Sequence, residues 1–505
     1  MSAADPSQNA ARRRRTLAVT SSATFMVILD ITVVNVALPN IEHSLGASLT
    51  DLEWVADAYA LALGALLLIW GSVADRTGRK RVFLLGMAIF GIGSLLSSLA
   101  PSPTLLIGAR VIQGVGAAAL FATALALIGN EFEGAARGRA LGVWGAAIGA
   151  GLAVGPIVGG GLTDAFGWRA IFLINVPLAL AMLMWAPRMA ESRAGNADRP
   201  DWAGFALFGT SLTLVVFSLI EGVQLGWGSP LIYGSLAGGI GGATVFFTVV
   251  AKRPGAIFDA RLLANPSFAA STIAVAGQGV VIASVMLYLI RDLQDVGGHS
   301  PLAAGAEILP ITVVAFVASL VAGRMLRGGN AIWLMSAALV LLAIGSGLLA
   351  TTVPSGHWWD MLPAMLLLGA GWGATNPLAS QAALGAAPPS AAGMVSGFNN
   401  TARQIGIAAG IGGLGTLYQD LAASGSRVGL GGVSPTMARE LSVIIARHGL
   451  SQALRQSPVG LRVRVESAGV AGLVGALHAV ELAGAAIAAA CAIAVGFIAL
   501  RSSRV

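Results

Sequence analysis

A single carboxyl group within the first apolar stretch is the residue of this chain best placed to do chemistry. The run 17–39 is long enough to cross a bilayer as a helix, which needs roughly 20 residues, and it contains Asp30. An ionised carboxylate is costly in hydrocarbon, so such a group faces the protein interior or a water-filled cavity, where it is paired, hydrated or protonated. We therefore predict that Asp30 carries a proton and that the rest of the chain builds a cavity around it.

Arg110 is the predicted partner of this acid. It is a permanent charge within the apolar run 103–128. Asp30 lies nine residues before the outer end of its run, or ~13 Å at 1.5 Å per residue, and Arg110 lies seven residues after the start of its own, or ~10 Å. The two charges therefore lie at similar depths, which allows them to pair. The alternative is an arginine that extends its charge to the interface.

Other polar side chains in the apolar runs are candidates for the wall of the cavity. Asp57 lies about one turn inside the outer edge of the run 52–73. We interpret it as a second proton site or a contact for a cation, with a hydrated acid at the interface as the alternative. Glu307 and Glu481 lie near outer ends of their runs, where a hydrated group is favoured over a proton relay. The candidate residues of the substrate cavity are Asp30, Asn35, Asp57, Gln113 and Glu307.

The composition indicates a polytopic membrane protein. The chain is 56% hydrophobic and only 10% charged, against about 25% charged for an average soluble protein. Its net charge of +7 arises in short loops between the apolar runs, so it does not indicate a nucleic-acid partner. One cysteine and five scattered histidines predict no metal site, and the sequence has no phosphate-binding Gly-x-x-x-x-Gly-Lys-Ser/Thr loop. Enzyme chemistry and ATP as an energy source are therefore not expected.

Fourteen apolar runs can be marked, and an even number places both ends of the chain on the same side of the membrane. If the N-terminus is cytoplasmic, the inside segments hold 20 Lys and Arg residues, whereas the short outside loops hold two. We therefore expect a multi-pass protein of the plasma (inner) membrane, with residues 1–16 and 501–505 in the cytoplasm. The runs are 17–39, 52–73, 82–100, 103–128, 139–162, 168–187, 202–221, 230–250, 268–290, 302–323, 331–351, 358–381, 393–417 and 474–500.

An internal repeat is suggested by two short loops that are rich in Gly and Arg, at 71–80 and 323–329. They follow the second and the tenth run, so runs one to six would match runs nine to fourteen, with runs seven and eight inserted. The predicted domains are therefore 17–187, 188–267 and 268–500. Two related halves around a site at the midplane are a recurrent plan of transporters.

The first of these loops has the spacing Gly-x-x-x-Asp-Arg-x-Gly-Arg-Lys. Glycine permits close approach of helices, and the carboxylate and basic side chains suit interactions with helix ends. A plain basic loop on the cytoplasmic side is the alternative. The spacing resembles the loop signature of the major facilitator superfamily. Its residues are Gly71, Asp75, Arg76, Gly78, Arg79 and Lys80.

Two further motifs resemble this superfamily. Arg110-x-x-Gln113-Gly114 is similar to its fourth-span motif, which is associated with proton coupling. The fifth run has glycines four residues apart, which share one helix face and let a neighbour come close, and a proline that favours a kink. Generic glycine packing is the alternative. The pattern resembles the antiporter motif of proton-coupled exporters, here Gly151, Gly155, Pro156, Gly159 and Gly160.

Three stretches are similar to the fourteen-span drug:proton antiporter group of this superfamily, which includes quaternary-ammonium exporters. They are 54–59, 168–177 and 396–406. The second begins with Trp168 and suits an anchor at the outer interface. The third contains Arg403, which is a candidate for a gate, or else an arginine bonded to helix C-termini.

The resemblance implies an all-α integral membrane protein with the major facilitator fold: fourteen transmembrane helices, as two six-helix bundles plus two inserted helices. It implies a proton-coupled antiporter that exports hydrophobic, often cationic, drugs by alternating access. Its expected partners are small substrates, protons and the lipid bilayer; the energy source is the proton gradient rather than a cofactor, and the functional unit is a monomer. The alternatives are a dedicated exporter of one metabolite, antibiotic or lipid, and a proton-independent facilitator or membrane sensor.

The segment 418–473 differs from a short turn. Apolar residues recur at helical spacing over 436–456, and an alternation of apolar and charged residues over 461–466 predicts a short strand. We expect an ordered extracellular cap or hairpin, with a flexible loop as the alternative.

Overall fold

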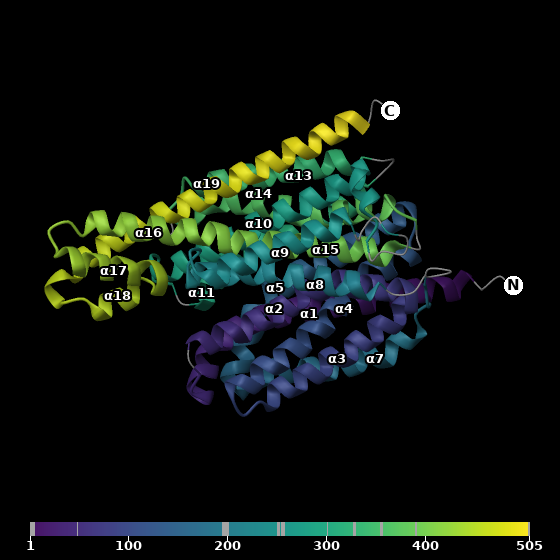
Figure 1. The fold of residues 1–505 in the computed structure, drawn as a ribbon, viewed down its shortest axis with the longest axis horizontal. Helices are drawn as coiled ribbons and strands as arrows, with labels where there is room; N and C mark the ends of the chain where they lie inside the picture. Colours follow the sequence, from purple (N-terminus) through teal and green to yellow (C-terminus); the bar gives the residue numbers. More distant parts are fainter. Residues whose placement is uncertain are drawn as a thin grey trace.

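The computed structural model describes nearly the whole chain as helices. Where the structure describes it, the chain contains no strand, so the predicted all-α class is confirmed there. Figure 1 shows the start of α1 and the end of α19 at one end of the molecule, which we call the inner end, and α16–α18 projecting at the opposite end, which we call the outer end. The described residues are 6–47, 49–193, 201–249, 253, 258–299, 301–326, 330–353, 357–388 and 391–502.

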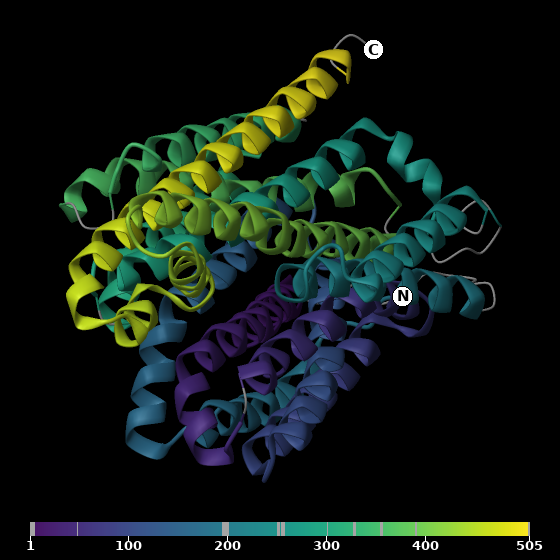
Figure 2. The ribbon, with the colours of Figure 1, turned by 60° about the vertical axis from the view of Figure 1, so that its left-hand side comes forward.

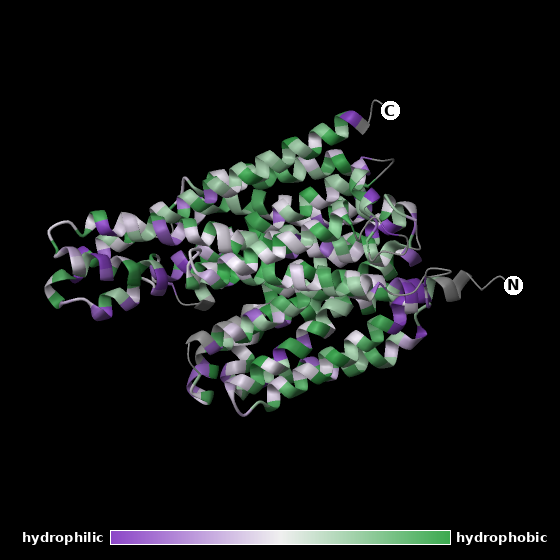
Figure 3. Ribbon diagram, in the orientation of Figure 1, coloured by the Kyte–Doolittle hydropathy of each residue, from purple (hydrophilic) through white to green (hydrophobic). Residues whose placement is uncertain are grey.

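Hydropathy divides the molecule along its long axis. Figure 3 shows hydrophobic residues over the middle of the molecule and hydrophilic residues gathered toward both ends. Among the described residues, twelve helical stretches are long and apolar enough to cross a membrane. The fourteen predicted runs include two more, in α14 and α15, which are not among the twelve. Both helices pack inside the molecule, α14 on α12 and α13 and α15 on α2 and α10, so they need less apolar surface for lipid.

The N-terminal helices pack as one bundle. α2 and α3 both pack on α4, and α1 packs on α5 (Figure 2). The short α6 and α7 pack on α3 and complete the group. The bounds are α1 (Pro6–Leu45), α2 (Leu49–Thr77), α3 (Arg79–Leu99), α4 (Pro103–Glu131), α5 (Gly134–Phe166), α6 (Arg169–Leu173) and α7 (Asn175–Trp185), with a 3-10 turn at Ala186–Arg188.

The C-terminal helices repeat these pairings. α12 and α13 both pack on α14, and α10 packs on α15, as the predicted correspondence of the two halves requires. α8 (Trp202–Leu225) and α9 (Pro230–Thr248) pack on each other between the two groups in sequence. The division into domains stays a prediction. The other bounds are a 3-10 turn at Ala260–Ala264, α10 (Pro266–Asp295), α11 (Pro301–Glu307), α12 (Leu309–Met325), α13 (Ala331–Leu349), α14 (Trp358–Gly385), α15 (Ala392–Ala409), a π-helical turn at Gly410–Leu414, α16 (Gly415–Gly429), α17 (Pro435–His448), α18 (Leu450–Gln456), a 3-10 turn at Val459–Leu461 and α19 (Arg462–Ser502).

The two bundles meet closely at the inner end, where α2 packs on α15 and α5 on α12. Glycines line both contacts: a Cβ added to Gly71 would lie 3.0 Å from the carbonyl carbon of Gly393, and one added to Gly142 would lie 2.8 Å from the carbonyl oxygen of Ser319. Both glycines lie in the inner half of their helix. The inner halves of the two bundles are therefore in backbone contact.

The outer cap consists of the end of α16, α17, α18 and the start of α19, so the predicted ordered cap is present as helices. The predicted strand at 461–466 is wrong, because α19 begins at Arg462. A strand there would need a partner for its backbone groups, and no strand lies among the described residues; a helix satisfies these groups internally. The alternation of apolar and charged residues over 461–466 does not separate a buried face from an exposed one, since Val463 is 81% exposed whereas Val465 is buried.

Candidate functional site

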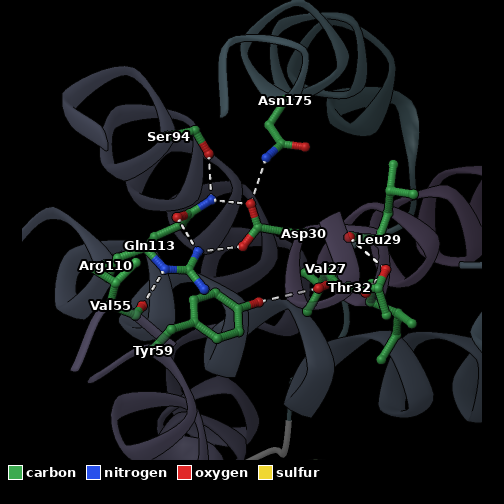
Figure 4. Close-up of polar contacts among 11 residues, drawn as sticks. Val27, Leu29, Asp30, Thr32, Val55, Tyr59, Ser94, Arg110, Gln113 and Asn175 are labelled. Carbon is green, nitrogen blue, oxygen red and sulfur yellow. Dashed lines mark hydrogen bonds and ion pairs between the residues drawn. The ribbon is translucent and has the colours of Figure 1, made fainter. Parts of the chain in front are cut away.

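Asp30 lies inside the N-terminal bundle, and its side chain has no exposed surface. Three side chains donate to its carboxylate: Arg110 Nη1 to Oδ2 at 2.5 Å, and Gln113 Nε2 and Asn175 Nδ2 to Oδ1 at 2.8 Å each (Figure 4). The contact with Arg110 is an ion pair, which partly offsets the cost of burying the charge. Both carboxyl oxygens of Asp30 thus have hydrogen-bond partners within the protein.

The guanidinium of Arg110 is held from several sides. Its Nε donates to the carbonyl oxygen of Val55 at 2.9 Å, and its Nη1 also donates to Gln113 Oε1 at 2.7 Å. Its Cζ lies 4.2 Å from the centre of the Tyr59 ring, within the range of a cation–π contact. The cation therefore ties α4 to α2 as well as to Asp30.

A shell of further contacts closes the cluster. Gln113 Nε2 donates to Ser94 Oγ on α3 at 2.8 Å, and the hydroxyl of Tyr59 donates to the carbonyl oxygen of Val27 at 3.3 Å (Figure 4). Ser94, Gln113 and Tyr59 are all buried. Asp30 and Arg110 therefore lie in one buried network that joins α1, α2, α3, α4 and α7.

The predicted pairing of Asp30 with Arg110 is present, and Gln113 belongs to the same cluster. Sequence reasoning missed Asn175, the first residue of α7. The available signal was an uncharged polar residue within the apolar run 168–187, which we assigned to an interface anchor instead.

Other predicted residues lie elsewhere. Asp57 is partly exposed on α2, and it lies two residues, or ~200° around the helix, from Tyr59, so it leaves α2 on the side away from the cluster. Glu307 lies at the end of α11 in the C-terminal half, where His299 Nδ1 is 2.8 Å from its Oε1. The side chain of Asn35 lies outside the described residues. The structure therefore does not place the candidate cavity residues in one group.

The glycine stripe of α5 faces α1. A Cβ added to Gly151 would lie 2.9 Å from Ile28 Cγ2, and one added to Gly159 would lie 3.0 Å from the Cα of Val33. Gly155 faces Thr32, whose hydroxyl donates to the carbonyl oxygen of Gly151 at 3.4 Å. α1, the helix that carries Asp30, therefore packs closely against α5 at these glycines. By contrast, a Cβ on Gly160 meets open space, and the side chain of Pro156 lies outside the described residues.

The loop motif joins the two bundles at the inner end. Asp75 forms a buried ion pair with Arg79, 2.7 Å from Arg79 Nη2, and accepts from the backbone N–H groups of Gly393 at 2.9 Å and Met394 at 2.7 Å at the start of α15. A carboxylate at a helix N-terminus is favoured by the helix dipole. Asp75 therefore locks α15 of one bundle to the end of α2 of the other.

The remaining members of the loop motif contact the chain after α7. The Cβ position of Gly78, where φ is 119°, lies 2.8 Å from the carboxyl carbon of Glu191, and the backbone N–H of Lys80 donates to Glu191 Oε1 at 3.0 Å. Lys80 Nζ donates to the carbonyl oxygen of Pro187 at 3.2 Å. Arg76 is partly exposed.

Arg403, the candidate gate, lies between the bundles. Its Nη2 donates to Asn400 Oδ1 at 2.5 Å and its Nη1 to Asn376 Oδ1 at 3.3 Å. Its Cζ lies 5.3 Å from the ring of Phe121 on α4. Arg403 is thus bound to side chains rather than to helix C-termini, and it contacts the opposite bundle.

Comparison with known proteins identifies the family. The profile described as Major Facilitator Superfamily matches residues 20–411, which include the Asp30 cluster, the loop motif and the glycine stripe. The chain belongs to the major facilitator superfamily.

Relatives within the superfamily confirm the predicted resemblance to drug-resistance transporters. The puromycin resistance protein pur8 of Streptomyces alboniger is 37% identical over 414 residues, covering 80% of this chain and 82% of the relative. The multidrug resistance protein Stp of Mycobacterium tuberculosis (strain H37Rv) is 32% identical over 446 residues, covering 88% and 81%. Among solved structures, the human organic anion transporter MFSD10 (TETRAN) has a TM-score of 0.62 at 15% identity, covering 94% of this chain and 99% of that one, which shows the shared fold.

Membership of the superfamily makes this chain a multi-pass membrane transport protein rather than an enzyme. Its described residues contain no group of three or more His, Cys, Asp or Glu side chains that could hold a metal ion. The site chemistry to be explained is therefore that of the Asp30 cluster.

Proposed function

We propose that this chain exports small hydrophobic compounds, many of them cations, in exchange for protons, and that Asp30 binds the exchanged proton. The observation that carries the proposal is the buried carboxylate of Asp30, held by Arg110, Gln113 and Asn175 within a membrane-spanning bundle. Acids that lie within membrane spans and pair with a cation commonly mark ion pathways. Relatives named for resistance to puromycin and to multiple drugs support export as the direction of transport.

The proposal includes an orientation. The excess of Lys and Arg in one set of loops supports a cytoplasmic inner end, with both termini inside and the chain in the plasma membrane. We also propose that α14 and α15 cross the membrane, which gives fourteen spans as two six-helix bundles with α8 and α9 inserted. The monomer is the proposed functional unit, and no cofactor is required.

The contacts between the bundles support an alternating-access cycle. The inner ends are in backbone contact through Gly71 and Gly142, and Asp75 and Arg403 bridge the bundles. With the proposed orientation, the described state is closed toward the cytoplasm. Substrate enters from the cytoplasm only after α2 separates from α15 and α5 from α12.

The Asp30 cluster links the proton to this movement. In the outward-facing state a proton from outside neutralises Asp30, which weakens its attraction for Arg110 and frees the guanidinium for other partners. In the inward-facing state, substrate binding and the return of Arg110 favour release of the proton to the cytoplasm. The gradient supplies about 1.4 kcal/mol per pH unit and ~2.3 kcal/mol per charge per 100 mV. Asp57, Gln113, Asn35 and Glu307 remain candidates for substrate contacts.

Inside-out membrane vesicles test the proposal. An acid lumen is expected to drive accumulation of puromycin and of ethidium, a fluorescent cation, by the wild type, and the Asp30→Asn variant is expected to lose this accumulation. Asp420→Asn makes the same change at an exposed residue of α16 and is the matched control. If Asp30→Asn retains full gradient-driven transport, Asp30 is not the proton carrier.

Two alternatives are separated by related measurements. A dedicated exporter of one compound is supported by the relative that is named for resistance to puromycin alone. Growth of expressing cells on a panel of unrelated antibiotics would then show protection against one compound only. A proton-independent facilitator or sensor would give the same protection, or none, whether or not a protonophore is present.

A further inference from the structure

We propose that Asp292 and Glu481 form a second proton-binding site, at the outer end of the C-terminal bundle, in which two carboxyl groups hold one proton. This site deepens the proposed function, on which its part in transport rests, although the proton itself can be detected without transport. The sequence placed Glu481 at a hydrated outer edge, and the structure places it in the interior.

Glu481 is a buried acid whose carboxyl group has no hydrogen-bond partner among the described residues. It lies on α19 and is wholly buried. The backbone carbonyl oxygen of Glu481, by contrast, accepts a hydrogen bond from Ser346 Oγ on α13 at 2.7 Å. A buried carboxylate without donors is strongly disfavoured, whereas the neutral acid is tolerated.

Asp292 on α10 is the second member. It is wholly buried, and one oxygen accepts a hydrogen bond from the hydroxyl of Tyr418 on α16, while the other has no partner among the described residues. Tyr418 stacks on Tyr288 with ring centres 4.3 Å apart, which fixes the position of the donor. One neutral donor satisfies only part of the hydrogen-bonding capacity of a carboxylate, which has two acceptor oxygens.

The register of α10 and α19 places the two acids within two turns of each other on facing helices. The Cβ position of Gly484 lies 3.6 Å from Val281 Cγ1 and 3.8 Å from Val285 Cγ2. The two helices run in opposite directions, so Glu481, three residues before Gly484, lies level with the turn between Val285 and Asp292. Both acids have carboxyl oxygens without a partner among the described residues, and both are buried. Two negative charges on facing helices in the protein interior repel each other, and one shared proton removes the repulsion.

Arg291, the residue next to Asp292, makes its hydrogen bonds and its ion pair with other groups. Arg291 Nη2 donates to the carbonyl oxygen of Ala446 on α17 at 2.8 Å, and Arg291 Nε lies 3.5 Å from Asp295 Oδ2. Arg291 therefore fastens the cap to α10 and leaves the pair short of positive charge, although it lies over the Tyr418 ring at 5.5 Å.

No other described neighbour compensates the pair. On α19, the Nε2 atom of His478 lies 2.6 Å from the carbonyl oxygen of Thr352. On α15, Arg403 is bound to asparagines, and α13 has no ionisable residue between 331 and 349. Asp420 on α16 is exposed. Within the described residues, the ionisable groups around the pair are thus Tyr288, Arg291, Asp295, Tyr418 and His478.

Infrared difference spectroscopy of the purified protein tests the site, because a protonated carboxyl group has its own C=O stretching band. We expect such a band at neutral pH in the wild type and its loss in Glu481→Gln. Asp30→Asn and Asp420→Asn are expected to keep it, since Asp30 lies in the other bundle, paired with Arg110, and Asp420 is exposed. Tyr418→Phe, which removes the hydrogen bond to Asp292, is expected to shift the band and to show that the folded protein is being observed.

The outcomes separate this site from the proposed function. A band that persists in both Glu481→Gln and Asp292→Asn, or that is absent from the wild type, overturns the proposal, even if Asp30→Asn abolishes proton-driven export. A band that depends on Glu481, in a protein whose export is indifferent to the proton gradient, supports the site and removes the proposed function. A melting temperature like that of the wild type confirms that each variant is folded.

Discussion

The two buried acid sites of this molecule solve the same physical problem in opposite ways. In the N-terminal bundle, Asp30 receives an arginine, a glutamine and an asparagine, so its negative charge is matched inside the protein. In the C-terminal bundle, Glu481 receives no donor among the described residues, and Asp292 receives one. Burial alone therefore does not describe a titratable group in a membrane protein; the donors around it decide which charge state the fold supports.

The difference also separates two ways of coupling a proton to structure. In the proposed cycle, a proton that binds at Asp30 displaces its ion pair with Arg110 and so weakens a contact between α1 and α4. A proton that binds at Asp292 and Glu481 displaces nothing and relieves repulsion. The first site is suited to driving movement, and the second to holding a proton at rest.

The largest effect on stability and transport is expected from removing Arg110, the cation that pairs with Asp30. Arg110→Met leaves Asp30 buried without its counter-charge, and breaking a buried pair from one side costs about 3–5 kcal/mol. We expect a marked fall in the melting temperature in detergent and loss of gradient-driven export. Arg188→Met is the control, because that exposed side chain donates, among the described residues, only to the carbonyl oxygen of Met184 in the helix just before it. A variant at Arg110 that melts with the wild type would show that the pair contributes nothing to the fold.

An intermediate effect is expected for a neutral donor of the same site. Asn175→Leu removes a hydrogen bond to a charged group, which is worth about 1.5–3 kcal/mol. The melting temperature should fall by less than in Arg110→Met, and export should be retained in part. Thr123→Val, which loses only a bond to a carbonyl of its own helix, should change less. Equal melting of the Asn175 and Thr123 variants would mean that Asn175 does not support the carboxylate.

The smallest effect on stability is expected at the site of Asp292 and Glu481. Whether stability rises or falls there is the sharpest test of the difference between the two acid sites. Glu481→Leu replaces an acid without partners by an apolar side chain, which should leave stability within about 1 kcal/mol of the wild type or raise it. Asp30→Leu should destabilise the protein, because it orphans Arg110. Thermal melts of the two variants side by side decide the matter; an equal loss of stability in both would erase the distinction between the sites.

Parts of this picture were available from the sequence because they depend on helix geometry alone. The depth of Asp30 and Arg110 follows from counting residues along two runs, and the face shared by Gly151, Gly155 and Gly159 follows from their spacing. The structure brings both sets into contact as that geometry suggests.

Other parts depend on which helices become neighbours, which counting within a run does not reveal. Asn175 reaches Asp30 from a helix start that the sequence assigned to the interface. Glu481 was placed near an outer edge because its run was taken to begin at 474, whereas α19 begins at Arg462 and is 41 residues long. The extra turns belong to the cap, and α10 and α13 pack against α19 where Glu481 lies.

That uninterrupted helix has a practical consequence. Because α19 runs from the cap to the inner end without a break, the cap is rigidly tied to the bundle rather than tethered by a loop (Figure 1). An antibody fragment raised against α17 and α18 would therefore report the orientation of the whole C-terminal bundle. In electron microscopy, it would give a small protein with little mass outside the bilayer a fixed landmark for particle alignment.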